Sequence, residues 1–334
     1  MGAKLRRAIK AYLVVLMAVF FVIYLAPVPD LKVATALAPV MSPRALNAFV
    51  VAGNSVVTNL SACDQDRRKL PSLLGEGLHK KVIDFSFPGQ TVGQGLDYTT
   101  FALRRFHAGA AVFFLSPTLS SRSIPDLQTQ MFFRFAASPE YEENSLQQRF
   151  KPDAPLLGPL TSHAEPFTYK NVRYPDYDGI KDIYYSAEKA AMGCPETLGK
   201  NRQFIEAFYW YTYVSQPVQN GNIAGLGKLQ EISNSIHKRV LFVLMPVDYD
   251  DVQSMNYALA QTIRTRVRST SEALKKENLN LLDLTEILPA DGFSDRWCAC
   301  GHLSESGRRT LSERVVQALQ TSTESENHTR TEEN

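Results

Sequence analysis

Residues 48–55, Ala48-Phe49-Val50-Val51-Ala52-Gly53-Asn54-Ser55, decide the fold that we expect for this chain. Five apolar residues followed by Gly-Asn-Ser are typical of a buried strand that ends in a tight turn. An apolar run without alternation indicates a strand that is covered on both faces, as in a parallel sheet. A serine directly after such a strand lies at the edge where open α/β sheets bind their ligands.

Further apolar runs alternate with helical patterns along the rest of the chain. The runs cover 81–87, 110–115, 239–245 and 279–284, and the helical patterns cover 66–79, 95–107, 224–237, 253–276 and 303–319. Strand and helix in repetition predict an α/β fold with a doubly wound, mostly parallel sheet in a three-layer, flavodoxin-like arrangement. The carboxyl ends of the first four strands carry Ser55, Gly89, Ser116 and Asp248.

Composition limits the function classes. The 334 residues include 36 basic and 34 acidic side chains, and the net charge of +2 gives no field for binding nucleic acid. An apolar content of 44% with 10% aromatic residues is that of a globular protein. We therefore expect a folded domain without a nucleic-acid partner.

The N-terminal region predicts a membrane anchor. Residues 11–28 carry no charge and as a helix would span about 27 Å, close to the thickness of a bilayer's hydrocarbon core. Only basic charges precede this segment, at Lys4, Arg6, Arg7 and Lys10. This asymmetry predicts a single-pass protein of the inner or cytoplasmic membrane, with its C-terminal domain on the extracytoplasmic, periplasmic side. A signal peptide cleaved near Ala36-Leu37-Ala38 and a buried core helix are the alternatives.

Composition also divides the chain. We expect a cytoplasmic flank and transmembrane segment over 1–28, a spacer over 29–46, an α/β domain over 47–320 and a disordered polar tail over 321–334. Residues 135–223 interrupt the alternation and contain the aromatic run 208–213. This insertion is either a helical cap over the sheet or a lid or partner surface.

An exported domain could contain disulfides. The four cysteines could form two bridges in three pairings, and free thiols are the alternative; they are Cys63, Cys194, Cys298 and Cys300. The spacing of Cys298 and Cys300 is narrower than in zinc fingers, so we predict no metal site there. We also expect no cofactor.

Ser55 and His302 are the candidate catalytic pair. A serine is nucleophilic only when a base takes its proton, and histidine commonly fills that role. His302 lies in Gly301-His302-Leu303-Ser304, directly before the last amphipathic helix. The predicted fold can bring this loop against the turn that follows the first strand.

Three short blocks together resemble the SGNH, or GDSL-type, hydrolase superfamily. They are VVAGNSVV (50–57), DFSFPGQT (84–91) and GHLSESGRRTLSERV (301–315). The resemblance implies that Ser55 attacks an ester carbonyl, that His302 is the general base, and that the N–H groups of Ser55 and Gly89 bind the oxyanion.

The chain departs from this family at three positions, and two of them bear directly on catalysis. Leu115-Ser116-Pro117-Thr118 follows the third strand without the asparagine that the family uses as an oxyanion donor. The family's acid lies three residues before its histidine, where this chain has Ala299, and the nearest upstream acid is Asp295. Asp295 could orient His302 if residues 297–301 form a bulged loop; otherwise the site is a dyad or inactive. Asn54 also replaces the usual aspartate.

The anchor and the aromatic insertion are similar to the cell-envelope branch of that superfamily, the D-alanyl-transfer and polysaccharide O-acetylation proteins. We therefore expect a membrane-anchored serine acyl hydrolase or acyltransferase that acts on an envelope glycan or its precursor. The resemblance implies a membrane-embedded O-acyltransferase as partner and an envelope polysaccharide or teichoic-acid-like acceptor. The alternatives are a non-catalytic subunit that binds such a partner, and a lipase or esterase.

Overall fold

The structure of the protein is a computed structural model, which describes residues 48–60, 64–86, 90–105, 108–119, 167–174, 202–215, 218, 220–294 and 301–332. The predicted membrane segment 11–28, the four cysteines, Gly89 and Asp295 lie outside these residues. Within the described part of the chain, no helix has the length and apolar character that a membrane span requires.

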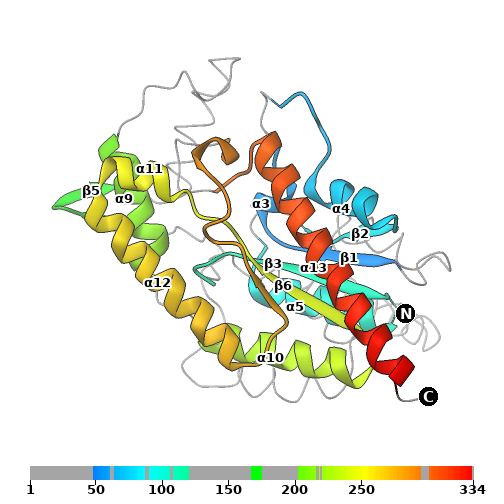
Figure 1. Ribbon diagram of the computed structural model, residues 1–334. Coiled ribbons are helices and arrows are strands. Elements are labelled where there is room, and N and C mark those ends of the chain that lie inside the picture. Colours follow the sequence, from blue (N-terminus) through cyan, green and yellow to red (C-terminus); the bar gives the residue numbers. More distant parts are fainter. Residues whose placement is uncertain are drawn as a thin grey trace, which may run out of the picture.

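A five-stranded parallel sheet forms the centre of the molecule (Figure 1). The strands are β1 (Phe49–Ala52), β2 (Val82–Asp84), β3 (Ala110–Leu115), β6 (Arg239–Leu244) and β7 (Leu281–Asp283). Their order is β2-β1-β3-β6-β7, and every neighbouring pair is parallel. The predicted parallel α/β sheet is therefore confirmed. The strand order reverses between β1 and β3, and doubly wound sheets bind ligands at the carboxyl ends of the strands at such a point.

The two faces of β1 explain why its sequence is apolar throughout. Phe49 and Val51 belong to one buried cluster, and Val50 and Ala52 belong to another. Successive side chains of a strand point to opposite faces, so a strand covered on both sides needs apolar residues at every position.

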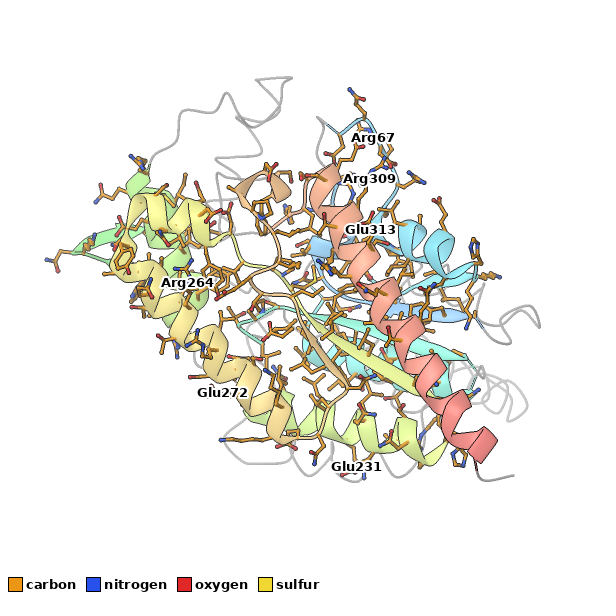
Figure 2. All side chains as sticks on the ribbon, viewed as in Figure 1. Arg67, Glu231, Arg264, Glu272, Arg309 and Glu313 are labelled. Carbon is orange, nitrogen blue, oxygen red and sulfur yellow. The ribbon has the colours of Figure 1, made fainter. Side chains whose placement is uncertain are left out.

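Helices form the outer layers. On the first face, α4 (Leu70–Leu78) and α13 (Glu305–Glu332) contribute Leu70, Leu74, Leu311 and Val315 to the core. On the second, α5 (Val92–Arg105) and α10 (Asn220–Ser235) contribute Leu96, Ala102, Leu226 and Leu229. Figure 2 shows side chains filling the space between sheet and helices, while Glu231, Glu272 and Glu313 project outward.

A second cluster lies beside the sheet and is here named the aromatic lobe. It consists of the antiparallel hairpin β4 (Phe167–Tyr169) and β5 (Val172–Tyr174), α9 (Arg202–Trp210), the π-helix η3 (Tyr211–Ser215), α11 (Tyr249–Met255) and α12 (Tyr257–Lys276). Figure 1 shows β5, α9 and α11 grouped at the end of the molecule opposite β2, and α12 running from this group toward α10. Their core combines aliphatic side chains with five buried aromatic ones, which are Phe208, Tyr209, Tyr211, Tyr213 and Tyr249.

Two helices differ from the sequence prediction. The helix expected over 253–276 is two helices, because Asn256 ends α11 and its Oδ1 accepts the N–H of Leu259 at 3.0 Å to begin α12. The last helix does not end near Gln320, since α13 continues to Glu332 through the segment where polar composition predicts disorder.

Candidate active site

Ser55 is the first residue of α3 (Ser55–Thr58), a one-turn helix directly after β1. Asn54 caps this helix, because its Oδ1 accepts the N–H of Val56 at 3.1 Å. Gly53 is required by packing: a Cβ there would lie 2.5 Å from Cγ2 of Val57 and 3.1 Å from Cβ of Phe114. The Gly-Asn-Ser turn thus packs closely on β3 and presents a half-buried Ser55 at the carboxyl end of the sheet.

His302 is held in the loop before α13 by backbone contacts with another loop. Its carbonyl accepts the N–H of Ser294 at 2.9 Å, and Phe293 and Leu303 form an antiparallel bridge. Gly301 turns the chain with a φ of +67°, a value that favours glycine. His302 therefore lies on a segment whose backbone is held in place by the loop at residues 293–294.

His302 and the helix of Ser55 meet through Asn59, the C-cap residue of α3. The Asn59 Nδ2 lies 3.0 Å from the Nε2 of His302. The backbone N–H of Asn59 donates to the carbonyl of Ser55 at 2.8 Å. The structure thus places His302 against the C-cap of α3, the helix that begins at Ser55, and the catalytic roles of Ser55 and His302 stay predictions. Within the described residues, the Ser55 hydroxyl makes no hydrogen bond.

Sequence reasoning missed Asn59. A signal was present, because a polar residue one helical turn after a candidate nucleophile lies on the same helical face. An unliganded serine–histidine pair is often loosely aligned, so the contact of His302 with Asn59 does not remove Ser55 as a candidate.

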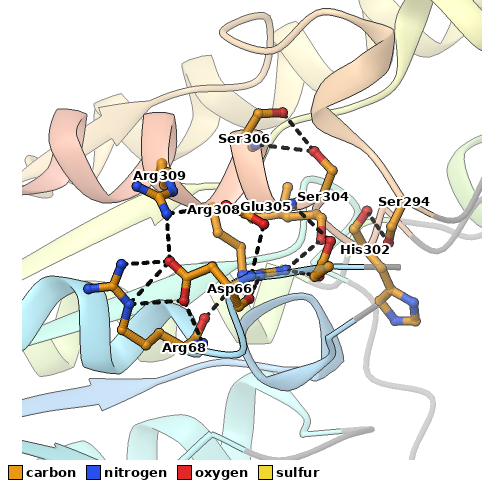
Figure 3. A network of polar contacts seen from close by, with 12 residues as sticks. Asp66, Arg68, Ser294, His302, Ser304, Glu305, Ser306, Arg308 and Arg309 are labelled. Carbon is orange, nitrogen blue, oxygen red and sulfur yellow. Dashed lines mark hydrogen bonds and ion pairs between the residues drawn. The ribbon is translucent and has the colours of Figure 1, made fainter. Parts of the chain in front are cut away.

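A buried ion pair fixes the helix that follows His302. Arg308 is 1% exposed, and its Nη1 lies 2.5 Å from Oδ2 of Asp64. Asp64 also accepts the N–H of Glu305 at 3.2 Å, and Glu305 in turn accepts the N–H of Asp66 at 2.9 Å. The loop between α3 and α4 is thereby joined to the start of α13 (Figure 3).

Asp66 extends this network toward the surface. Its carboxylate accepts from Arg68 at 2.6 Å and from Arg309 at 2.8 Å. The hydrogen bonds from Arg68 hold the pKa of Asp66 well below its usual value. Figure 3 shows the imidazole of His302 pointing away from these charges. The network therefore positions the backbone around His302, while the ring faces α3.

The other predicted strand-end residues have local roles. Ser116 contacts Oγ1 of Thr118 at 3.0 Å, and Asp248 caps α11 by accepting the N–H of Asp251 at 3.0 Å. Gly89 and Asp295 lie outside the described residues, so their assignments stay predictions. Asp295 follows Ser294, whose backbone N–H donates to the carbonyl of His302.

An open cleft lies along α4 and the edge strand β2, away from this site. Its lining includes Lys69, His79, Lys80 and Asp84, but neither Ser55 nor His302. Burial raises the pKa of Asp84, although the hydrogen bond from the N–H of Ser86 acts to lower it.

In the described part of the chain, no group of three or more His, Cys, Asp or Glu side chains could hold a metal ion.

Fold and site together define an α/β protein with a serine and a histidine at the carboxyl edge of a parallel sheet. No family model matches the chain, and no curated protein matches it. Among solved structures, it is similar to a lipase/acylhydrolase from Enterococcus faecalis, at 12% identity and a TM-score of 0.36, over 81% of this chain and 94% of that one.

Two further solved structures are similar. A GDSL-like lipase from Bacteroides thetaiotaomicron has 11% identity and a TM-score of 0.39, over 87% of this chain and 97% of that one. An acetyl xylan esterase from Geobacillus stearothermophilus has 10% identity and a TM-score of 0.36, over 81% and 94%. At these identities and TM-scores, the likenesses do not by themselves assign an activity to this chain.

Proposed function

We propose that the protein is a serine acyl hydrolase or acyltransferase in which Ser55 is the nucleophile and His302 the general base. The observation that carries this proposal is the position of His302. The loop before the last helix brings its Nε2 within 3.0 Å of Asn59, which is one helical turn from Ser55 on α3. A nucleophile and a base on facing elements at the edge of a parallel sheet are the minimum that covalent acyl transfer needs.

The reaction follows from these groups. The Ser55 oxygen attacks the acyl carbonyl as His302 Nε2 takes the hydroxyl proton, and the carbonyl oxygen becomes an oxyanion. The N–H of Ser55 is a candidate donor to that oxyanion, whereas the N–H of Val56 already donates to Asn54. When the tetrahedral intermediate collapses, His302 returns the proton to the departing alcohol oxygen. Water or a sugar hydroxyl then attacks the acyl-serine, with His302 again the base.

For the setting of this reaction, we propose the extracytoplasmic side of a membrane and an envelope glycan, or its precursor, as substrate. The charge asymmetry around residues 11–28 supports this setting. Asp295 would orient His302, and the N–H of Gly89 would be a second oxyanion donor. A membrane-embedded O-acyltransferase is the proposed partner.

One observation favours a second candidate, a non-catalytic subunit that binds such a partner. The Nε2 of His302 lies 3.0 Å from the Nδ2 of Asn59, and a base that accepts from this amide does not receive the Ser55 proton until the contact is exchanged. If no exchange occurs, the site does not react.

Covalent labelling with a fluorophosphonate probe separates the candidates. The enzyme candidate predicts one labelled site, at Ser55, and loss of labelling in Ser55→Ala. Ser116→Ala is the matched control, because Ser116 also follows a strand but contacts Thr118. Wild-type protein that is folded but unlabelled, and inactive toward p-nitrophenyl acetate, would support the binding subunit instead.

A further inference from the structure

A general base must keep one ring nitrogen available for the proton of the nucleophile. In His302 that nitrogen is Nε2, and it contacts the amide of Asn59 instead of the Ser55 hydroxyl. A side-chain NH₂ group only donates, so the Nε2 of His302 is the acceptor and a neutral ring carries its proton on Nδ1. This is the tautomer that a serine-activating histidine requires. Nε2 has a single lone pair in the ring plane, and the amide of Asn59 occupies it.

Both ends of the amide have neighbours. Oδ1 of Asn59 lies 3.5 Å from Oγ1 of Thr58, whose hydroxyl also reaches the Ser55 carbonyl at 3.4 Å, and Nδ2 is the end that faces His302. Asn59 is also fixed at its backbone, where its N–H donates to the Ser55 carbonyl at 2.8 Å. The donor is therefore held in place by the helix that carries the nucleophile.

Ser55 and Asn59 stand four positions apart at the two ends of α3. Side chains at this spacing lie on one face of a helix, so both can approach the same ring. One acceptor lone pair forms one good hydrogen bond, and the hydroxyl and the amide therefore compete for it.

We propose that Asn59 is a positioning residue that holds His302 in its reactive tautomer and competes with the Ser55 hydroxyl for Nε2. In the resting state the amide holds the base. The nucleophile becomes activated when the Ser55 hydroxyl replaces the amide at Nε2. This inference rests on the proposed roles of Ser55 and His302, and it adds a third residue to them.

Two substitutions at Asn59 separate competition from packing, because they are expected to act in opposite directions. Asn59→Ala removes the competing donor, so fluorophosphonate should label Ser55 about two- to tenfold faster, the range expected for losing one net hydrogen bond. Asn59→Asp keeps the size of the side chain but presents an acceptor, which favours a proton on Nε2. Labelling of that variant should be at least tenfold slower than wild type. Asn278→Asp, at an exposed position outside the site, should label at the wild-type rate.

Nitrogen-15 NMR of the His302 ring tests the contact without relying on activity. The wild-type neutral ring should carry its proton on Nδ1, and Asn59→Asp should move the proton to Nε2 or yield an imidazolium. If both Asn59 variants label more slowly than wild type, or both at its rate, competition is wrong. If the wild type is not labelled at all, the proposed function fails, and the NMR result still decides whether Asn59 holds the ring.

Discussion

The candidate site and the aromatic lobe are held together in different ways. The site joins segments from opposite ends of the described domain, and its links are directional: a buried ion pair, backbone bridges and an amide on an imidazole. The lobe depends on the packing of aliphatic and aromatic side chains, among them Tyr209 and Tyr213 with ring centroids 6.0 Å apart, and on the carboxylate of Glu206. Directional contacts fix where an atom points, whereas packing tolerates shifts of shape and direction.

The largest expected effect is on turnover. Ser55→Ala and His302→Ala should each lower acyl transfer by at least about 10³-fold, and the double variant should be little worse, because the two residues act as one unit. Tyr169→Phe in the lobe should stay near the wild-type rate. Ester hydrolysis measured beside circular dichroism checks this. Additive losses from Ser55 and His302 would mean that they serve separate roles.

The buried ion pair should give the largest effect on stability. Arg308→Met leaves Asp64 without its buried partner and should lower the free energy of unfolding by about 3–5 kcal/mol. Arg309→Met is the matched control, because Arg309 is half-exposed and its ion pairs should contribute less than about 1 kcal/mol. Urea unfolding measures both. Equal losses would show that burial of Arg308 is not what makes its ion pair matter.

Helix packing beside His302 gives a smaller test. A Cβ at Gly307 would lie 2.0 Å from the carbonyl oxygen of Gly292, a backbone atom of the segment that braces His302. Gly307→Ala should therefore cost about 1–3 kcal/mol and slow the labelling of Ser55. Gly221→Ala, in α10 with open space around its Cβ, should be neutral or slightly stabilising. A neutral Gly307→Ala would mean that α13 can shift without disturbing the site.

The smallest expected effect is in the lobe. The Oε1 of Glu206 accepts from Tyr169 at 2.6 Å, Lys170 at 2.7 Å and Asn256 at 2.6 Å. Burial acts to raise the pKa of Glu206, but these donors together lower it below the usual 4.5. The charged form therefore adds stability above about pH 4.5, and this contribution is lost as the pH falls through the lower folded pKa.

Glu206→Gln should then lower the stability at pH 7 by about 1 kcal/mol, and less at pH 3. Urea unfolding of wild type and variant at both pH values measures the difference. If wild type and Glu206→Gln differ in stability by as much at pH 3 as at pH 7, the charge of Glu206 is not the source of its effect.

The sequence predicted the sheet because its strands are locally distinctive. Residues 49–52 and 240–244 are buried apolar runs, and both became interior strands of the sheet. The approach of the His302 loop to the region after β1 could also be anticipated, since helix and strand alternate up to the last loop. The break at Asn256 was missed because residues on both sides of it follow the helical pattern.

The polar contacts of the site could not be predicted in the same way. An arginine in the first turn of a helix is usually exposed, and only the path of the loop over 64–68 shows that Arg308 is buried beneath it. Asn59 and His302 are 243 positions apart, and no local pattern relates them. Directional contacts between distant segments depend on tertiary structure, which hydrophobic periodicity does not encode.

The separation of Asn59 and His302 along the chain also has a consequence for biosynthesis. A ribosome releases the segment with Ser55 and Asn59 early and His302 near the end. Contacts between residues so far apart in the sequence form late, because closing the long loop costs entropy. A growing chain can complete β1, β2 and β3 while it still lacks His302 and α13. The candidate nucleophile Ser55 therefore meets the candidate base His302 only when the last helix has docked, so a nascent or truncated chain would contain Ser55 without His302 beside it.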